Sequence, residues 1–496
     1  MARKVLPPVP TPLIDVEVVA AARRRSPLAV LVPAPDGDTG WETADAALFT
    51  GQRATGKPGE VRTVGDPASR ALWLVGVGGG TAKDYRTAGA ALIRAADAHV
   101  VTETEADARP SRTAQAELPD GAGPAEAAEF ALGAALGGYT FTLTADDPKP
   151  RVRTLRLVVG QETAVAPVTA AVGRALELAA ASALARDLAN TPSNVKDPVW
   201  LAGTAERVAA AASGLSVTVR DERWLAEQGF GGVLAVGGGS ASPPRLIELS
   251  YRPRGATTHI LLVGKGITFD TGGISIKPAD GMHLMRTDMA GGGAVIAAAR
   301  AIANLRLPVR VTALVPSAEN HVSGSSYRPG DVVRHYGGTT TEVGNTDAEG
   351  RMVLADALAY GIRKFSPDVV VDVATLTGAM KLSLGVRTGG LFATEDALAE
   401  RVAAAGERAG EAWWRMPLLE DLAGDVRGEI ADLRQAPQGP GGIVAALFLR
   451  EFTGGLPWAH LDIAGPGRSE RNYAEVVPGG TGFAARTLVE FAASYA

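Results

Sequence analysis

The stretch GNTDAEGRMVLADAL, residues 344–358, joins a polar turn to the start of an apolar helix, expected near Met352. Asp347, Glu349 and Arg351 stand two residues apart within it. If the turn is locally extended, side chains at i, i+2 and i+4 project to one side and share one small space. Two carboxylates that close are unfavourable unless a cation or a proton lies between them. The stretch is compatible with a metal site and also with an acidic helix start paired with Arg351.

Length and composition limit the kinds of protein and site that the chain can form. The chain has 496 residues, more than one ordinary core accommodates, so we expect at least two domains. It is 46% hydrophobic and 21% charged, as globular proteins are. Its net charge of -5 provides no general attraction for a polyanion, so nucleic-acid binding is not expected. Because there is no cysteine, any metal must be held by oxygen or nitrogen.

Neither a signal peptide nor a membrane span is expected. The basic start, residues 1–25, is interrupted by prolines and acids before an apolar run develops. No segment reaches roughly 18 uninterrupted apolar residues. We therefore expect a cytoplasmic protein without membrane association.

The first part of the chain has the pattern of a small α/β domain, in which apolar runs alternate with a helical run. Glycines at 76, 78 and 79 invite comparison with nucleotide-binding turns, but Thr81 stands where the third glycine of that fingerprint should fall, which favours a plain tight turn. The pattern predicts strands at 28–33, 72–77, 139–144 and 154–159, a helix at 86–98 and an exposed loop at 103–129.

A long alanine- and leucine-rich run separates this part from the rest. Residues 169–189 contain few helix breakers, and the prolines of the following NTPSNVKDP end the run. We therefore predict a smaller N-terminal α/β domain over residues 1–165, a connecting helix over 166–190, and a larger catalytic α/β domain over 191–496.

Strand-like and helical runs alternate in this larger domain, a pattern typical of a mainly parallel sheet covered on both faces. In such sheets ligands bind beyond the carboxyl ends of the strands, so the polar residues there should form one chemical set. Strands are expected at 215–219, 246–249, 259–263, 309–315, 369–373 and 458–463, and helices at 293–305, 352–365, 396–406 and 443–452.

The polar residues that follow these strands do form such a set. Oxygen ligands without cysteine suit magnesium, manganese or zinc. Four carboxylates exceed what a single catalytic zinc normally uses, so a two-metal site fits better. The small-residue loop ATLTGA, residues 374–379, is suited to lining a pocket. The carboxylates are Asp270, Asp288, Asp347 and Glu349, and the cations expected beside them are Lys265, Lys277 and Arg351.

These motifs resemble those of the leucyl aminopeptidases, the hexameric dinuclear cytosol aminopeptidase family. NTDAEGR is the signature of that family. GKGITFDTGGISIKP, MRTDMAGG, RPGDVV, DVATLTGA and WAHLDIAG occur in the family's order and approximate spacing. The resemblance extends from about residue 190 to the C-terminus, and the first 160 residues resemble the family only in layout.

The resemblance implies two divalent metal ions, manganese, zinc or magnesium. One ion would be bound by Asp270, Asp347 and Glu349, with the main-chain carbonyl of Asp347. The other would be bound by Lys265, Asp288, Asp270 and Glu349. A water between the ions would lose a proton near neutral pH and act as the nucleophile. Lys265 ligates only as a neutral amine, so the cations must lower its pKa; on the residues alone, Lys265 is a charged partner of Asp270.

The resemblance also assigns roles to two further cations. Lys277 would polarise the scissile carbonyl and stabilise the tetrahedral oxyanion. Arg351, just ahead of a helix N-terminus, would hold a bicarbonate that acts as the general base. On the residues alone, Lys277 is a surface lysine beside Pro278 and Arg351 forms a helix-capping ion pair.

Four residues match family positions around the pocket for the first substrate side chain, although each is also compatible with ordinary core or turn. A thioether with small neighbours favours an adaptable apolar pocket. The chain departs from the family at 466–468, PGR, where an aromatic residue is usual, and at 478–479. These departures concern side-chain preference and not the metal ligands. The four pocket residues are Met285, Thr375, Leu376 and Gly378.

The expected activity is hydrolysis of the N-terminal peptide bond of peptides with a free N-terminus, carried out by a homohexamer. Two alternatives come from other classes. A dinuclear phosphoesterase is one, since two cations also suit phosphoryl displacement. A nucleic-acid-binding or scaffold protein is the other, although the acidic balance argues against it.

Overall fold

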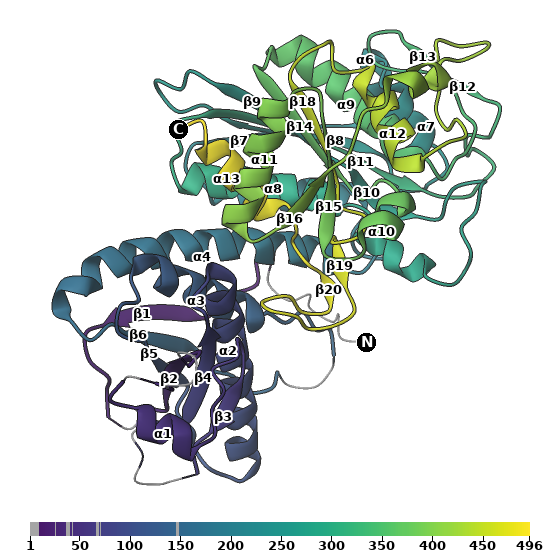
Figure 1. Cartoon of the computed structure of the whole chain (residues 1–496). Coiled ribbons are helices and arrows are strands. Elements are labelled where there is room, and N and C mark those ends of the chain that lie inside the picture. The colour runs from purple at the N-terminus through teal and green to yellow at the C-terminus, as the bar shows by residue number, and fades with distance from the viewer. Residues whose placement is uncertain are drawn as a thin grey trace. The chain divides into compact units, whose positions relative to one another are not determined.

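The computed structural model describes residues 9–24, 26–35, 40–41, 43–65, 69, 71–144 and 148–496. The chain divides into two compact units (Figure 1). The first comprises Met1–Ala183 and Glu470–Pro478, and the second Leu184–Ser469 and Gly479–Ala496. The division falls inside α4 (Glu162–Asn190), and no sequence pattern predicted that a segment near the C-terminus belongs to the first unit.

The first unit is built on a six-stranded sheet with the order β1-β6-β5-β2-β4-β3. Its strands pair in parallel except β3, which is antiparallel to β4. The predicted strands at 28–33, 72–77 and 154–159 are present. The strands are β1 (Asp15–Val19), β2 (Leu28–Pro33), β3 (Val61–Thr63), β4 (Trp73–Gly78), β5 (Thr113–Glu117) and β6 (Thr154–Val158).

Helices α1 (Ala46–Gly51), α2 (Ala82–Glu105) and α3 (Pro124–Gly137) complete this unit. Helices α2 and α3 pack closely because glycines lie at their crossing. A Cβ on Gly89 or Gly133 would lie 2.0 Å from a main-chain oxygen of the other helix.

Two predictions for the first unit are wrong. Residues 103–129 contain β5 and the start of α3 instead of an exposed loop, and residues 139–144 form no strand. The run TAQAE of β5 is rich in alanine, which carries no strand signal. The strand is held by its neighbours on both sides and by buried Gln115, whose amide group bonds to the main chain of Arg23 and Ser26.

The second unit is built on a nine-stranded mixed sheet. Its centre is parallel, as predicted: β18, β14, β9 and β11 follow one another, and β10 pairs with β11. Strand β8 is antiparallel to both β11 and β7, and β15 is antiparallel to β18. The strands are β7 (Leu215–Arg220), β8 (Arg245–Tyr251), β9 (His259–Gly264), β10 (Gly266–Asp270), β11 (Arg310–Asn320), β14 (Val369–Ala374), β15 (Thr388–Ala393), β16 (Ala412–Arg415) and β18 (Trp458–Asp462).

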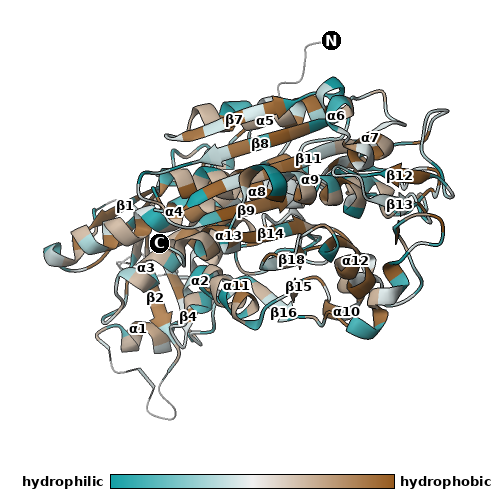
Figure 2. Ribbon diagram, turned by 90° about the horizontal axis from the view of Figure 1, so that it is seen from above, coloured by the Kyte–Doolittle hydropathy of each residue, from teal (hydrophilic) through white to brown (hydrophobic). Residues whose placement is uncertain are grey.

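Helices cover this sheet in two layers (Figure 1). In one layer α8 packs against α13, which packs against α11; in the other α9 packs against α7 and α12. The central strands are mostly hydrophobic (Figure 2), because both faces are covered. These helices are α7 (Gly231–Gly237), α8 (Ala290–Asn304), α9 (Glu349–Phe365), α11 (Asp396–Ala409), α12 (Gly441–Arg450) and α13 (Ala485–Ala493).

The second unit contains further helices and strands. They are helices α5 (Pro198–Ala210), α6 (Glu222–Gln228), α10 (Gly378–Leu384), η1 (Met282–Thr287) and η2 (Glu420–Val426), and strands β12 (Val332–Arg334), β13 (Thr340–Glu342), β17 (Leu433–Arg434), β19 (Arg468–Ser469) and β20 (Gly479–Gly480).

By length and composition, α4 could cross a membrane. However, 56% of its apolar window is buried inside the protein, which is typical of a core helix. Among the described residues, no other helix has both the length and the apolar composition.

A buried charged pair joins the two central strands β14 and β18. Asp372 accepts hydrogen bonds from Trp458 Nε1 at 2.7 Å and His460 Nδ1 at 2.6 Å. Burial alone would lower the pKa of His460, but the carboxylate of Asp372 more than offsets this and raises it above its ordinary value.

We predict that Asp372→Asn lowers the free energy of unfolding by about 3–5 kcal/mol, because it leaves a buried imidazolium without its counter-charge. The stabilisation by His460 is complete below its unfolded pKa and is lost as pH rises through its raised folded pKa. The loss caused by the mutation should therefore be largest below about pH 6.5 and smaller in alkaline buffer.

Thermal unfolding at several pH values measures this difference. Asp396→Asn is the matched control, because Asp396 pairs with Arg415 at the surface with 93% of its side chain exposed. A destabilisation by Asp372→Asn that is the same at all pH values would contradict the charged pair.

Candidate active site

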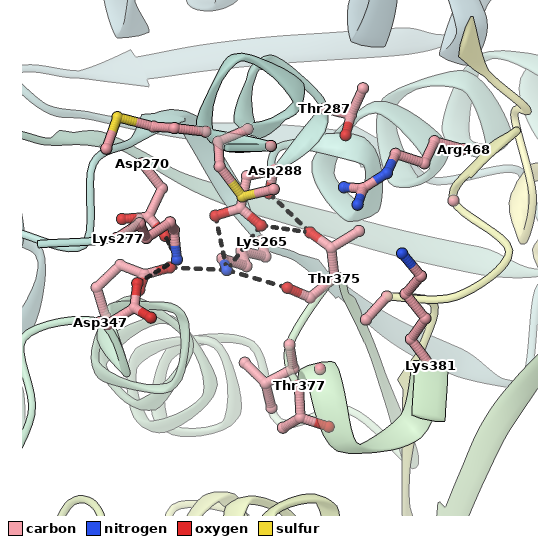
Figure 3. Close-up of a pocket in the computed structure, with 18 of the residues that line it drawn as sticks. Lys265, Asp270, Lys277, Thr287, Asp288, Asp347, Thr375, Thr377, Lys381 and Arg468 are labelled. Carbon is pink, nitrogen blue, oxygen red and sulfur yellow. Dashed lines mark hydrogen bonds and ion pairs between the residues drawn. The ribbon is translucent and has the colours of Figure 1, made fainter. Parts of the chain in front are cut away.

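A pocket of about 390 Å³ lies where the central strands end (Figure 3). Strand β9 leads directly into Lys265, β10 ends at Asp270, and β14 leads into the loop that begins at Thr375. All of the predicted metal ligands and side-chain-pocket residues line this pocket, and so does Lys277. Arg351 is not among its lining residues. The structure therefore brings together all but one of the predicted site residues.

Three of the carboxylates form a tight group. One oxygen each of Asp270, Asp347 and Glu349 lies within 4.8 Å of the others. Burial, and then the charge of Asp288, raises the pKa of Asp270 to about 6. Burial, and then the charge of Asp270, raises the pKa of Glu349 to about 8. The protein thus holds negative charge where it is electrostatically costly, as in sites that bind a cation.

Lys265 is buried among a second set of oxygen atoms, which come from Asp288, Glu349 and Thr375. Its Nζ is 2.8 Å from Asp288 Oδ2, 2.7 Å from Glu349 Oε1 and 3.1 Å from the carbonyl oxygen of Thr375. The two carboxylate oxygens are at ion-pair distance but without hydrogen-bond geometry. Burial lowers the pKa of Lys265, but the two carboxylates outweigh it and raise the pKa. Lys265 pairs with Asp288 and Glu349, not with Asp270 as the charged-partner alternative expected.

Lys277 forms ion pairs with two members of the carboxylate group. Its Nζ is 2.7 Å from Asp270 Oδ2 and also pairs with Asp347. Burial lowers its pKa, but the charge of Asp270 more than offsets this and raises it. Lys277 retains 19% side-chain exposure and lines the pocket, so it is an accessible cation and not a surface lysine.

The NTDAEGR turn is held from three sides. Tyr327 Oη and Asn320 Nδ2 both donate to the carbonyl of Thr346, at 2.8 and 3.0 Å. Asn320 also donates to Asp270 Oδ1 at 2.8 Å, so one amide group links two parts of the site. Gln435 accepts from the main-chain amides of residues 344 and 345. Sequence spacing gave no signal for Asn320, Tyr327 or Gln435.

The glycine of this turn is required by packing. A Cβ on Gly350 would lie 2.6 Å from Lys265 Cε and 2.8 Å from both Cδ and Nζ of that side chain. Helix α9 begins at Glu349, so Gly350 and Arg351 belong to its first turn. The expectation that the helix begins near Met352 is therefore wrong by three residues, and the close approach of Lys265 explains the small residue.

Arg351 is buried in that first turn. It donates through Nη1 to the carbonyl of Gln435 at 2.7 Å, and its Nε has no hydrogen-bond partner among the described residues. Burial lowers its pKa to about 10, so the guanidinium remains charged at neutral pH. The alternative for Arg351 was a helix-capping ion pair. No carboxylate of the described residues forms such a pair with it.

Asp462, at the end of β18, fixes the loop that lines the pocket. Its carboxylate accepts from the amides of Leu376 and Thr377 at 3.2 and 3.0 Å and from Thr377 Oγ1 at 2.7 Å. It also accepts from the amide of Ala464 at 3.0 Å. Sequence reasoning missed this residue, although an acid at the end of a parallel strand was an available signal.

Lys196 was also missed, and it supports the segment that carries Asp288. The fully buried ammonium donates to the carbonyls of Leu188, Ala189 and Arg286 at 2.8, 3.1 and 2.5 Å. Burial lowers its pKa well below the ordinary value. Thr375 completes this support by donating through Oγ1 to Asp288 Oδ1 at 2.7 Å.

The sequence matches known families and proteins over most of its length. A model of the catalytic domain of the cytosol aminopeptidase family matches residues 183–489. A Streptomyces coelicolor protein named "Probable cytosol aminopeptidase" is 42% identical over 521 residues, which cover 96% of this chain and 95% of that protein. A Syntrophotalea carbinolica protein of the same name is 42% identical over 465 residues, with 91% and 92% covered.

Solved structures agree with this match over both units. Bottromycin maturation enzyme BotP in complex with Mn has a TM-score of 0.84 and 40% identity, with 95% of this chain and 99% of that chain covered. A mutant tomato leucine aminopeptidase has a TM-score of 0.84 and 30% identity, with 97% of each chain covered. The chain therefore belongs to the cytosol aminopeptidase family and is a metal-dependent aminopeptidase, a hydrolase of the α/β class.

Proposed function

We propose that the enzyme hydrolyses the N-terminal peptide bond of peptides with the help of two divalent cations. The observation that carries this proposal is the group of carboxylate oxygens from Asp270, Asp347 and Glu349 within 4.8 Å of one another. These oxygens fit a hard cation such as Mn²⁺, with which the BotP structure is in complex. Zinc and magnesium suit the same ligand types.

The chemistry around Lys265 supports a second cation. Asp288 Oδ2 and Glu349 Oε1 are buried acceptors without a hydrogen bond of good geometry. Between two carboxylates the pKa of Lys265 is raised, but two nearby divalent cations would reverse the local field and favour the neutral amine. Lys265, Asp270, Asp288 and Glu349 would then hold this ion, with Asp270 and Glu349 shared between the two ions.

Bound divalent cations at such a site supply a Lewis acid and a water whose pKa is near neutral. The residues of the chain have separate tasks. Metal charge would replace Lys277 as counter-charge for Asp270 and Asp347 and leave its ammonium for the substrate. Lys277 then donates hydrogen bonds to the scissile carbonyl oxygen and stabilises the oxyanion that develops there.

Arg351 is proposed to hold a bicarbonate that accepts a proton during the reaction. The buried guanidinium with an unbonded Nε, in the first turn of α9, suits a small planar anion. The neighbouring Gln435 carbonyl already occupies Nη1, which leaves the remaining donors of the fork to the anion.

Family membership favours the peptidase over the phosphoesterase alternative. We further propose a homohexamer in the cytoplasm. The assembly rests on the resemblance to hexameric leucyl aminopeptidases, and the compartment rests on the names of the curated relatives.

We predict that Asp347→Asn lowers the affinity for metal and the turnover of aminoacyl anilides together, each by at least about 100-fold, because it removes a direct ligand. Metal content per subunit by mass spectrometry and initial rates measure both effects. Asp280→Asn is the control, since Asp280 also lines the pocket but lies outside the carboxylate group. Full activity of Asp347→Asn with one ion or none would defeat the proposed site.

We predict that Lys277→Met lowers kcat by about 10²–10³-fold while two metal ions stay bound, because it removes the charge that stabilises the oxyanion. Steady-state rates and metal content on the same preparation provide the measurement. Loss of metal in parallel with loss of rate would assign Lys277 to metal retention and contradict its role toward the substrate.

A further inference from the structure

The pocket has a second, cationic end that the metal chemistry does not use. Lys381 and Arg468 line the pocket and lie on the side away from Asp270 and Asp347 (Figure 3). Thr375 lies between the two ends and contacts Lys265 on the metal side. Thr375 is one of the residues expected around the first substrate side chain, so a side chain that passes it would reach Lys381 and Arg468.

The backbone fixes where Lys381 stands. It lies in α10, three residues after Gly378, which also lines the pocket. The helix is capped by Thr377, whose side chain accepts from the amide of Met380 and donates to Asp462. The residue is exposed, and no carboxylate of the described residues forms an ion pair with it. Lys381 is thus an exposed cation on a capped helix at the pocket wall.

Arg468 enters the pocket from a different element. It belongs to β19 and pairs with Gly480 of β20. The preceding Gly467 donates to the carbonyl of Ile463 at 2.8 Å and accepts from Thr481 at 3.1 Å. Arg468 stands where the sequence departs from the family pattern, in the run PGR. Arg468 therefore brings a guanidinium to the pocket on a strand whose main chain is hydrogen-bonded.

Most of the acids of the pocket lie at one end, together with Lys265 and Lys277. Four of its five acids are the proposed metal ligands, and the fifth, Asp280, is exposed on the segment before η1. Bound metal ions would neutralise the acid end, so that the pocket as a whole would favour an anion. An arginine fork and an ammonium together offer the geometry and charge that bind a carboxylate.

We propose that Lys381 and Arg468 bind the side-chain carboxylate of an N-terminal glutamate or aspartate, so that peptides with an acidic first residue are a preferred substrate class. This assignment rests on the proposed function, because the metal end must hold the reacting peptide bond. It revises the apolar pocket expected from Met285 and its small neighbours, which then contact only the aliphatic part of the side chain.

Glutamine is the matched comparison for glutamate, because the two side chains differ only in charge and one donor group. For metal-loaded wild-type enzyme we expect kcat/KM for a glutamyl anilide to exceed that for the glutaminyl anilide by at least about tenfold, the effect of one charged hydrogen bond. The ratio should fall as ionic strength rises, because the cations are partly exposed.

The variants Lys381→Met and Arg468→Met should each lower the glutamyl-to-glutaminyl ratio by about tenfold, and Lys381→Arg should retain most of it. Lys381→Glu should bring the ratio below one. Lys83→Met, which removes an exposed lysine of α2 that does not line the pocket, is the control and should leave the ratio unchanged. A merely structural role for either cation would lower both rates together and leave the ratio as it was.

A wild-type ratio near one, or a ratio that the Lys381 and Arg468 variants leave unchanged, would overturn the proposal. The proposal would also be overturned if the two cations bind the C-terminal carboxylate of a dipeptide instead. In that case Leu-Gly would be cleaved faster than its amide, and the glutamyl and glutaminyl anilides would be cleaved at equal rates. Absence of turnover for leucyl, glutamyl and glutaminyl anilides alike would instead indicate failure of the proposed function.

Discussion

The site depends on buried carboxylates that the fold forces together at the ends of parallel strands. Asp270 and Glu349 are almost fully buried, and burial raises both pKa values. Repulsion adds to this, from Asp288 on Asp270 and from Asp270 on Glu349. A nearby positive charge relieves this cost, and the chain provides part of it through Lys265 and Lys277. Bound cations would provide the rest.

The second unit holds these charges in place through hydrogen bonds from side-chain and main-chain amides. Asn320 ties Asp270 to the NTDAEGR turn, and Asp462 fixes the loop after β14. Gly350 lets α9 begin against the side chain of Lys265. Each of these residues positions a charged side chain or a loop of the pocket, so the catalytic geometry depends on the edge of the sheet as well as on the ligands.

Much of the fold and of the site could be predicted from the sequence, wherever the type of residue indicates one kind of structure. Apolar runs predicted the central strands, and charged residues after them indicated the site. Strand β5 was missed because alanine and glutamine do not favour a strand by their sequence pattern. The start of α9 was expected three residues late because the acid and the glycine were assigned to the turn before the helix. Asn320 could not be found, since its importance lies in partners distant along the chain. Asp462 did carry a signal, as an acid at the end of a parallel strand, but the sequence reasoning missed it.

Calorimetric titration of metal-depleted enzyme with Mn²⁺ tests the central claim most directly. We expect two ions to bind per subunit, with release of protons to the buffer, because Lys265 and the carboxylates with raised pKa must lose theirs on ligation. Saturation at a single ion per subunit, or binding without proton release, would contradict a two-metal site built around Lys265.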